Sequence, residues 1–159
     1  MFDTKTLNEL TEYINNTSDR SSIYLGCDST VNFSDKNAKK PYATFTFVVI
    51  IHKDSCRGCK IFGDSFTKQL PGYQVTKPAQ RLMEEVVTAV DVYNQIYPVI
   101  ADREIEIHLD INPDERHASS GIIQQAMGYV KGVTQITPTV KPGAFAASCA
   151  ADRFIGATI

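Results

Sequence analysis

The stretch that decides the fold is IEIHLDIN, residues 105–112, which alternates in the manner of a β-strand. Its apolar residues fall on one side and its polar residues, which include His108 and Asp110, fall on the other. An earlier stretch, IYLGCDST at 23–30, alternates in the same way and carries Asp28 toward its carboxyl end. The two aspartates are either a coincidence or the floor of a metal site. The second interpretation requires the two strands to be parallel neighbours.

The rest of the chain predicts an α/β fold around these strands. Apolar spacing, β-branched runs and turn residues predict the following order: helix 4–16, strands 22–28, 43–52 and 59–68, helix 78–97, strand 104–110, helix 121–132, strand 133–140 and helix 142–155. Three consecutive strands predict an antiparallel meander, and the alternating part predicts parallel strands. We therefore expect a single domain over 1–159, a five-stranded mixed sheet flanked by helices, with an N-terminal lead-in helix.

Composition and charge narrow the classes of function. The chain is 43% hydrophobic and 21% charged, an ordinary globular composition. No apolar run approaches the roughly 20 residues of a membrane span, and the first residues do not form a secretion signal, so we expect a cytoplasmic protein without a membrane partner. The net charge of −2, with small basic clusters at 37–40 and 140–142, weighs against broad nucleic-acid binding. It does not exclude a nuclease, whose metal ions supply positive charge.

The four cysteines fall into two groups. Cys27 and Cys149 are expected to be small buried hydrophobes. Cys56 and Cys59 form a CxxC at the expected hairpin turn, where Gly58 would supply the permissive backbone geometry. A CxxC is half of a zinc ligand set, and no second half follows it. The sequence favours an unmetallated turn over a zinc ion shared between two chains.

Glu85 is the most informative acid outside the two strands. It shares the apolar stripe of the helix expected at 78–97, where a bare carboxylate is costly unless it is paired or bound to a cation. Glu84 lies about 100 degrees round the helix and nearer to solvent, so Glu85 is favoured over Glu84 as the functional residue. Asp152 lies on a small-residue face of the final helix, and its alternative role is a salt bridge to Lys141 or Arg153.

Two histidines and one lysine complete the set of candidates. His108 projects to the same face as Asp110, although such a residue is more often a hydrogen-bonded, half-buried histidine than a ligand. His117, in a polar loop before a helix, is a candidate proton carrier or an ordinary exposed histidine. Lys141, directly after the last strand, is a candidate phosphate contact or an ordinary surface lysine.

Four segments resemble the motifs of the YkuK family of ribonuclease-H-like proteins: GCDST (26–30), RLMEEV (81–86), IHLDIN (107–112) and VKPGAFAASCAADRF (140–154). The resemblance extends over nearly the whole chain from residue 22 and implies the ribonuclease-H-like fold. It also implies that four acids would match the positions that bind two divalent cations in nucleases of this fold: Asp28, Glu85, Asp110 and Asp152.

The resemblance implies a metal-dependent nuclease that hydrolyses phosphodiester bonds in RNA, DNA or a hybrid. Carboxylate ligands suit Mg²⁺ or Mn²⁺ rather than zinc, and two such ions would hold the scissile phosphate. His108 or His117 would assist proton transfer, and Lys141 would contact phosphate. One alternative is a non-catalytic module of the same fold that binds nucleic acid or a protein partner. Another is a homo-oligomer that pairs through the apolar run FTFVVII, 45–51.

Overall fold

The computed structural model describes residues 1–32, 41–71, 77–100, 103–114, 116–117, 119–151 and 153–154. For Cys149 it describes the backbone alone. A five-stranded sheet forms the middle layer, in the order β3-β2-β1-β4-β5. Its strands are β1 (Ser22–Asn32), β2 (Tyr42–His52), β3 (Cys59–Gln69), β4 (Ile105–Leu109) and β5 (Thr139–Val140). β1 to β3 form an antiparallel meander, β4 runs parallel to β1, and β5 runs parallel to β4. The predicted mixed sheet is confirmed.

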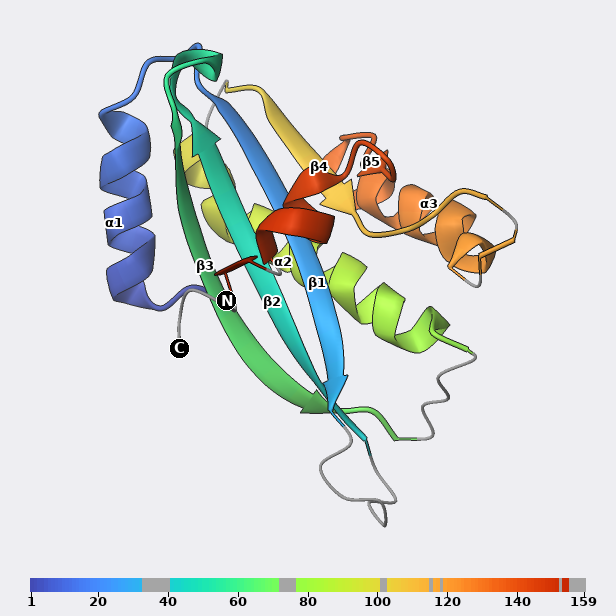
Figure 1. The fold of residues 1–159 in the computed structure, drawn as a ribbon. Helices are drawn as coiled ribbons and strands as arrows, with labels where there is room; N and C mark the ends of the chain where they lie inside the picture. Colours follow the sequence, from blue (N-terminus) through green and yellow to red (C-terminus); the bar gives the residue numbers. More distant parts are fainter. Residues whose placement is uncertain are drawn as a thin grey trace.

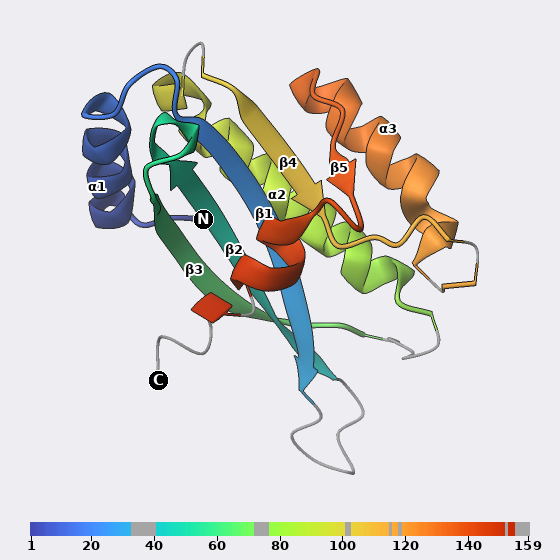
Figure 2. The same cartoon turned by 45° about the horizontal axis from the view of Figure 1, so that its top comes forward.

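Helices lie on both faces of this sheet (Figure 1). α1 (Thr4–Asn15), α2 (Ala79–Ile100) and α3 (Ile123–Thr134) pack into the main hydrophobic core. A short π-helix, η3 (Ala146–Ala150), lies across β1 and β2 on the opposite face, as Figure 2 shows. Within the described part of the chain, no helix has the length and apolar character needed to cross a membrane.

β2 is buried on both faces because the main core covers one face and η3 covers the other. Phe45, Phe47 and Val49 belong to the main core, whereas Val48 and Ile50 pack against η3. A strand that is covered on both sides reads as a continuous apolar run, which explains FTFVVII. β2 also pairs with both β1 and β3, so this run is not a free edge for a second copy, contrary to the premise of the homo-oligomer interpretation.

The close approach of η3 to β1 depends on Gly26. A Cβ atom at Gly26 would lie 2.4 Å from the backbone nitrogen of Ala147 and 2.5 Å from the carbonyl carbon of Ala146. Only a glycine on the strand and small residues on η3 allow the two backbones to come so near. Ala146 and Ala147 are not among the residues expected to form the small-residue face of the final helix, although Phe145 and Ala151 of that face also pack toward the sheet.

The first strand and the hairpin turn are close to expectation. β1 extends to Asn32 rather than ending at residue 28, because its last residues continue to pair with β2. The CxxC lies in the turn between β2 and β3, where Gly58 has a φ of 83°. Cys56 and Cys59 are exposed free thiols. The turn and the role of Gly58 are confirmed.

The boundaries near the C-terminus differ more. α3 continues through Gly132 to Thr134 and ends at Gln135, whose left-handed φ of 63° closes the helix. The strand expected at 133–140 is therefore reduced to the two residues of β5. The helix continues past Gly132 because an exposed glycine weakens a helix without having to end it.

Candidate active site

The pairing of β1 with β4 brings the backbones of Asp28 and Asp110 near each other. β1 and β4 are parallel neighbours, and Cys27 lies opposite Leu109 in their register. Asp28 follows Cys27 within β1 and Asp110 directly follows β4, so the backbones of the two aspartates lie near each other where β4 ends. The strand adjacency that the metal-site interpretation requires is present.

Glu85 belongs to α2, which packs on the main-core face of the sheet, opposite η3. Its side chain is buried, with an exposed fraction of 5%, and its Oε1 accepts hydrogen bonds of 2.6 Å from the Ser29 hydroxyl and from Nη1 of Arg81. Burial raises the pKa of Glu85 from 4.5 to about 8, against the lowering effects of Arg81 and Ser29. The charges of Asp28 and Asp110 raise the pKa of Glu85 further. The three acids therefore form one electrostatic cluster.

Glu84 points elsewhere. Its Oε1 lies 2.5 Å from Nζ of Lys68, in a partly exposed ion pair between α2 and β3. Of the two adjacent glutamates, Glu85 is thus the one that faces the aspartates. This placement agrees with the preference drawn from the apolar stripe, while the functional role of Glu85 remains a prediction.

Arg81 is a member of the cluster that the sequence reasoning missed. Its Nη1 donates to the backbone carbonyl oxygen of Ser29 at 2.9 Å and to the Ser29 hydroxyl at 2.7 Å, in addition to Glu85. Arg81 therefore ties the N-terminal part of α2 to β1 and holds the Glu85 carboxylate in place. The i, i+4 spacing of Arg81 and Glu85 was the signal that could have revealed the pair.

Lys141 pairs with the other acid of the cluster. Its Nζ lies 2.7 Å from Oδ1 of Asp110, and its backbone N–H donates to the carbonyl oxygen of Ile111 at 3.1 Å. The Oδ1 atom is buried, yet it accepts no regular hydrogen bond from the described part of the chain. The contact is therefore an ion pair. Asp152, proposed above as a fourth acid with Lys141 as its alternative partner, lies outside the described residues.

His108 is more buried than expected, with an exposed fraction of 0%. The backbone N–H of Ala146 donates to Nδ1 at 3.1 Å, so the ring hydrogen belongs on Nε2, which lies 3.2 Å from Oε2 of Glu106. Burial lowers the pKa of His108, although the Glu106 carboxylate opposes this effect. A neutral His108 therefore fastens η3 to β4.

His117 lies on the surface, in the loop that follows β4. Its backbone N–H donates to the carbonyl oxygen of Asp114 at 2.9 Å. The assignments of His108 and His117 to proton transfer remain predictions, and both ring nitrogens of His108 already have partners.

The cluster fits a hard divalent cation in the chemistry of its donors. Asp28, Glu85 and Asp110 offer carboxylate oxygens, the ligands that Mg²⁺ and Mn²⁺ prefer. The buried Oδ1 of Asp110 and the buried hydroxyl of Thr46, which lies opposite Asp28 on β2, both lack a hydrogen-bond partner among the described residues. In the arrangement described, however, no three His, Cys, Asp or Glu side chains of that part of the chain converge as a metal-ligand set.

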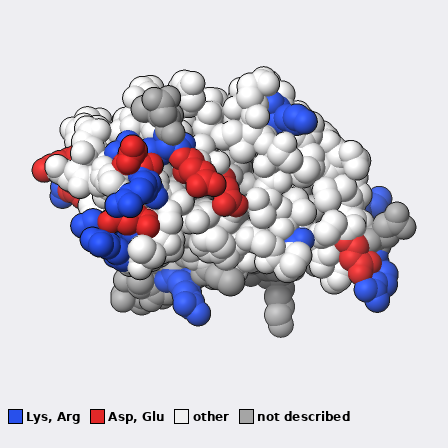
Figure 3. All heavy atoms as spheres, turned by 90° about the horizontal axis from the view of Figure 1, so that it is seen from above, with Lys and Arg blue, Asp and Glu red and all other residues white. Residues whose placement is uncertain are grey.

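The face seen in Figure 3 shows no broad basic patch among the described residues. In the view of Figure 3, basic and acidic residues are interspersed, and most of the face is uncharged. The basic cluster at 37–40 lies outside the described residues. This mixed surface agrees with the net charge of −2.

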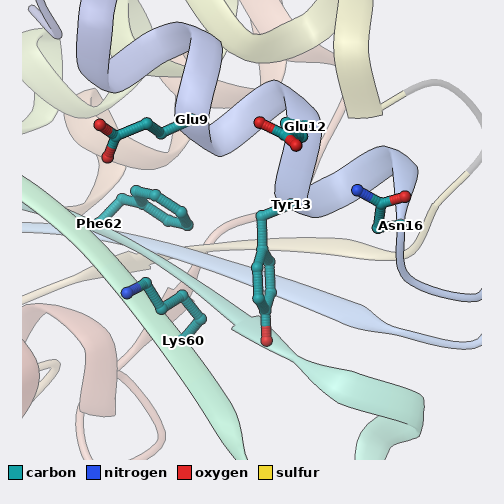
Figure 4. Close-up of a pocket in the computed structure, with 6 residues that line it drawn as sticks. All are labelled: Glu9, Glu12, Tyr13, Asn16, Lys60 and Phe62. Carbon is teal, nitrogen blue, oxygen red and sulfur yellow. The ribbon is translucent and has the colours of Figure 1, made fainter.

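A separate surface pocket lies between α1 and β3 and is about 280 Å³ in volume. Its lining residues, shown in Figure 4, are Glu9, Glu12, Tyr13, Asn16, Lys60 and Phe62. None of these residues is among the predicted site residues, so the pocket does not extend the acid cluster.

Comparisons with known proteins bear on the whole chain. No curated protein and no solved structure gave a match. The family described as ribonuclease H-like matches residues 5–155, a range that includes the three described acids, η3 and the strands of the sheet. The strand order and the family match agree with the resemblance noted in the sequence, and the chain thus belongs to the ribonuclease-H-like family, in its YkuK group.

Proposed function

We propose that this protein is a nuclease that uses Mg²⁺ or Mn²⁺ to hydrolyse phosphodiester bonds. Asp28, Glu85 and Asp110 would bind the cation, and Asp152 would be a fourth ligand. The observation that carries the proposal is the electrostatic coupling of Glu85, which is buried with a pKa of about 8, to Asp28 and Asp110 on the neighbouring strands β1 and β4. Carboxylates gathered in this way repel one another, and a divalent cation relieves the repulsion.

In the proposed reaction, the cation and the residues around it would have separate roles. When bound, the cation would supply a nucleophile from water and neutralise charge on the phosphate. Asp28 and Asp110 are held by the paired strands, which fixes the spacing of their backbones. Arg81 and Ser29 orient the Glu85 carboxylate through hydrogen bonds of 2.6 Å. The main core under α2 keeps bulk water from the Glu85 side of the cluster.

The first test is the affinity for Mn²⁺, measured by calorimetric titration. We expect the wild type to bind Mn²⁺ and Asp110→Asn to bind it at least about tenfold more weakly, because a ligand is lost. Glu84→Gln is the matched control, since it removes the same charge from the adjacent residue of α2 that faces Lys68. An absence of binding heat in the wild type would contradict the proposal.

The second test is cleavage of single-stranded, duplex, hybrid and branched nucleic acids with Mn²⁺ present. We expect one of these substrate classes to be cut by the wild type and none by Asp28→Asn. Cleavage that persists in Asp28→Asn would arise from a contaminating enzyme and would count against this site.

A second candidate function is a non-catalytic module of the same fold that binds nucleic acid or a protein partner. The ion pairs Arg81–Glu85 and Lys141–Asp110 favour it, because they supply positive charge to two of the three acids without a metal. This candidate predicts that EDTA leaves binding of the partner unchanged and that no cleavage occurs with Mn²⁺.

A further inference from the structure

A pocket of about 390 Å³ opens beside the acid cluster, where β4 and β5 end. Three separate segments form it: the residues after β4, the residues after β5 and η3. Its lining residues are Asn112, Pro113, Lys141, Pro142 and Ser148. This volume lies within the range, roughly 300–1,000 Å³, of pockets that bind small ligands.

Among the described residues, the only charged group that lines the pocket is the Lys141 ammonium. The Lys141 ammonium carries three N–H donors, and its ion pair with the single Oδ1 atom of Asp110 occupies one of them. The Oδ1 atom of Asn112 accepts from the backbone N–H of Asp114 at 3.0 Å, so the amide offers its NH₂ end to a ligand. An ammonium and an amide NH₂ together provide donors for an anion.

The position of Lys141 explains how an anion can come close to three acids. Asp28 and Asp110 would repel a phosphate electrostatically. Lys141 pairs with Asp110 on one side and lines the pocket on the other, so it neutralises the carboxylate nearest to the pocket. The position of the Lys141 backbone is fixed by the hydrogen bond from its N–H to the carbonyl oxygen of Ile111, which joins the segment after β5 to the segment after β4.

We propose that this pocket binds a backbone phosphate of nucleic acid, adjacent to the linkage held at the acid cluster, through the Lys141 ammonium and the Asn112 amide. The proposal rests on the proposed function for the identity of the neighbouring site. The same chemistry would also accept inorganic phosphate or a free nucleotide. The experiment therefore compares these sources.

The test measures binding in EDTA, where no metal-dependent cleavage occurs. The affinity for a labelled single-stranded oligonucleotide would be measured by fluorescence anisotropy. Inorganic phosphate and thymidine 5′-monophosphate would then be tested as competitors that displace the oligonucleotide. We expect Lys141→Met to weaken oligonucleotide binding about tenfold, as the loss of one charge-assisted hydrogen bond implies. Lys141→Arg should restore most of it. Lys131→Met, an exposed lysine of the last turn of α3, is the matched control and should change nothing.

A second readout separates a phosphate contact from a merely structural lysine. Lys141→Met should bind Mn²⁺ more tightly than the wild type, because Asp110 loses the ammonium that competes with the cation. A structural lysine would instead lower the melting temperature and weaken both ligands together. Weaker oligonucleotide binding with tighter Mn²⁺ binding supports the proposal.

Three outcomes would overturn it. One is oligonucleotide affinity that is the same in Lys141→Met and Lys131→Met, and another is weakening of both ligands in Lys141→Met. The third is competition by free phosphate or nucleotide without oligonucleotide binding, which would assign the pocket to a small anion. Failure of the proposed function looks different: the wild type would bind the oligonucleotide in a Lys141-dependent way but would neither bind Mn²⁺ nor cut.

Discussion

Glu85 makes the stability of the protein depend on pH. Its pKa in the folded state is about 8, above the usual 4.5, chiefly because of burial. Between these two values the folded state holds a proton that the unfolded state has released. Folding is therefore stabilised by this group at low pH, and that stability is lost as the pH rises toward 8. The loss over the whole window is about 5 kcal/mol.

We expect Glu85→Gln to remove most of this pH dependence, because glutamine keeps the shape of the side chain without an ionisable group. Urea unfolding at pH 5 and at pH 8.5 measures the change in the free energy of unfolding for each variant. Glu84→Gln should retain the slope of the wild type. Parallel profiles for the wild type and Glu85→Gln would show that Glu85 titrates normally.

The packing of η3 on β1 can be tested at a single glycine. Gly26→Ala places a methyl group within 2.4–2.8 Å of backbone atoms of Ala146 and Ala147, which cannot rotate away. We expect a loss of about 1–3 kcal/mol or more in the free energy of unfolding, measured with urea, and displacement of η3.

The control for this substitution is Gly128→Ala, in the middle of α3. A Cβ atom there meets nothing within 4 Å, and replacing a helical glycine by alanine should stabilise the protein by about 0.5–1 kcal/mol. Equal effects at the two positions would mean that η3 does not rest on β1. Because His108 also holds η3 through Ala146, the displaced helix should also release the His108 ring.

The distribution of charge on the molecule predicts how oligonucleotide binding depends on salt concentration. A protein with a net charge of −2 and no broad basic face on the view in Figure 3 should contact few phosphates. We expect the logarithm of the oligonucleotide binding constant to fall with the logarithm of salt concentration with a slope smaller than about 3. Titrations in EDTA at several salt concentrations measure it. A slope typical of six or more phosphate contacts would reveal a basic surface formed by residues beyond those described.

The fold and part of the site were predictable because each has a local pattern. Alternation with a period of two marked β1 and β4, and the apolar stripe of α2 separated Glu85 from Glu84. Local patterns do not specify contacts between distant segments. The pairing of Lys141 with Asp110, the hydrogen bonds from Arg81 to Ser29 and the close contact at Gly26 all depend on the tertiary arrangement. The helix expected to end at residue 132 continues to Thr134, because the left-handed conformation that ends it is adopted by Gln135.

The parallel pairing of β1 with β4 has a consequence for biosynthesis. Ile23 pairs with Ile105, so a ribosome delivers the second partner of β1 about 80 residues after β1 itself. Until then the nascent meander carries one side of β1 without hydrogen-bonding partners, a segment that chaperones would have to shield from other chains. The side chains of Asp28 and Asp110 also stay apart during this interval, so the proposed cation site would not form until synthesis has passed Asp110.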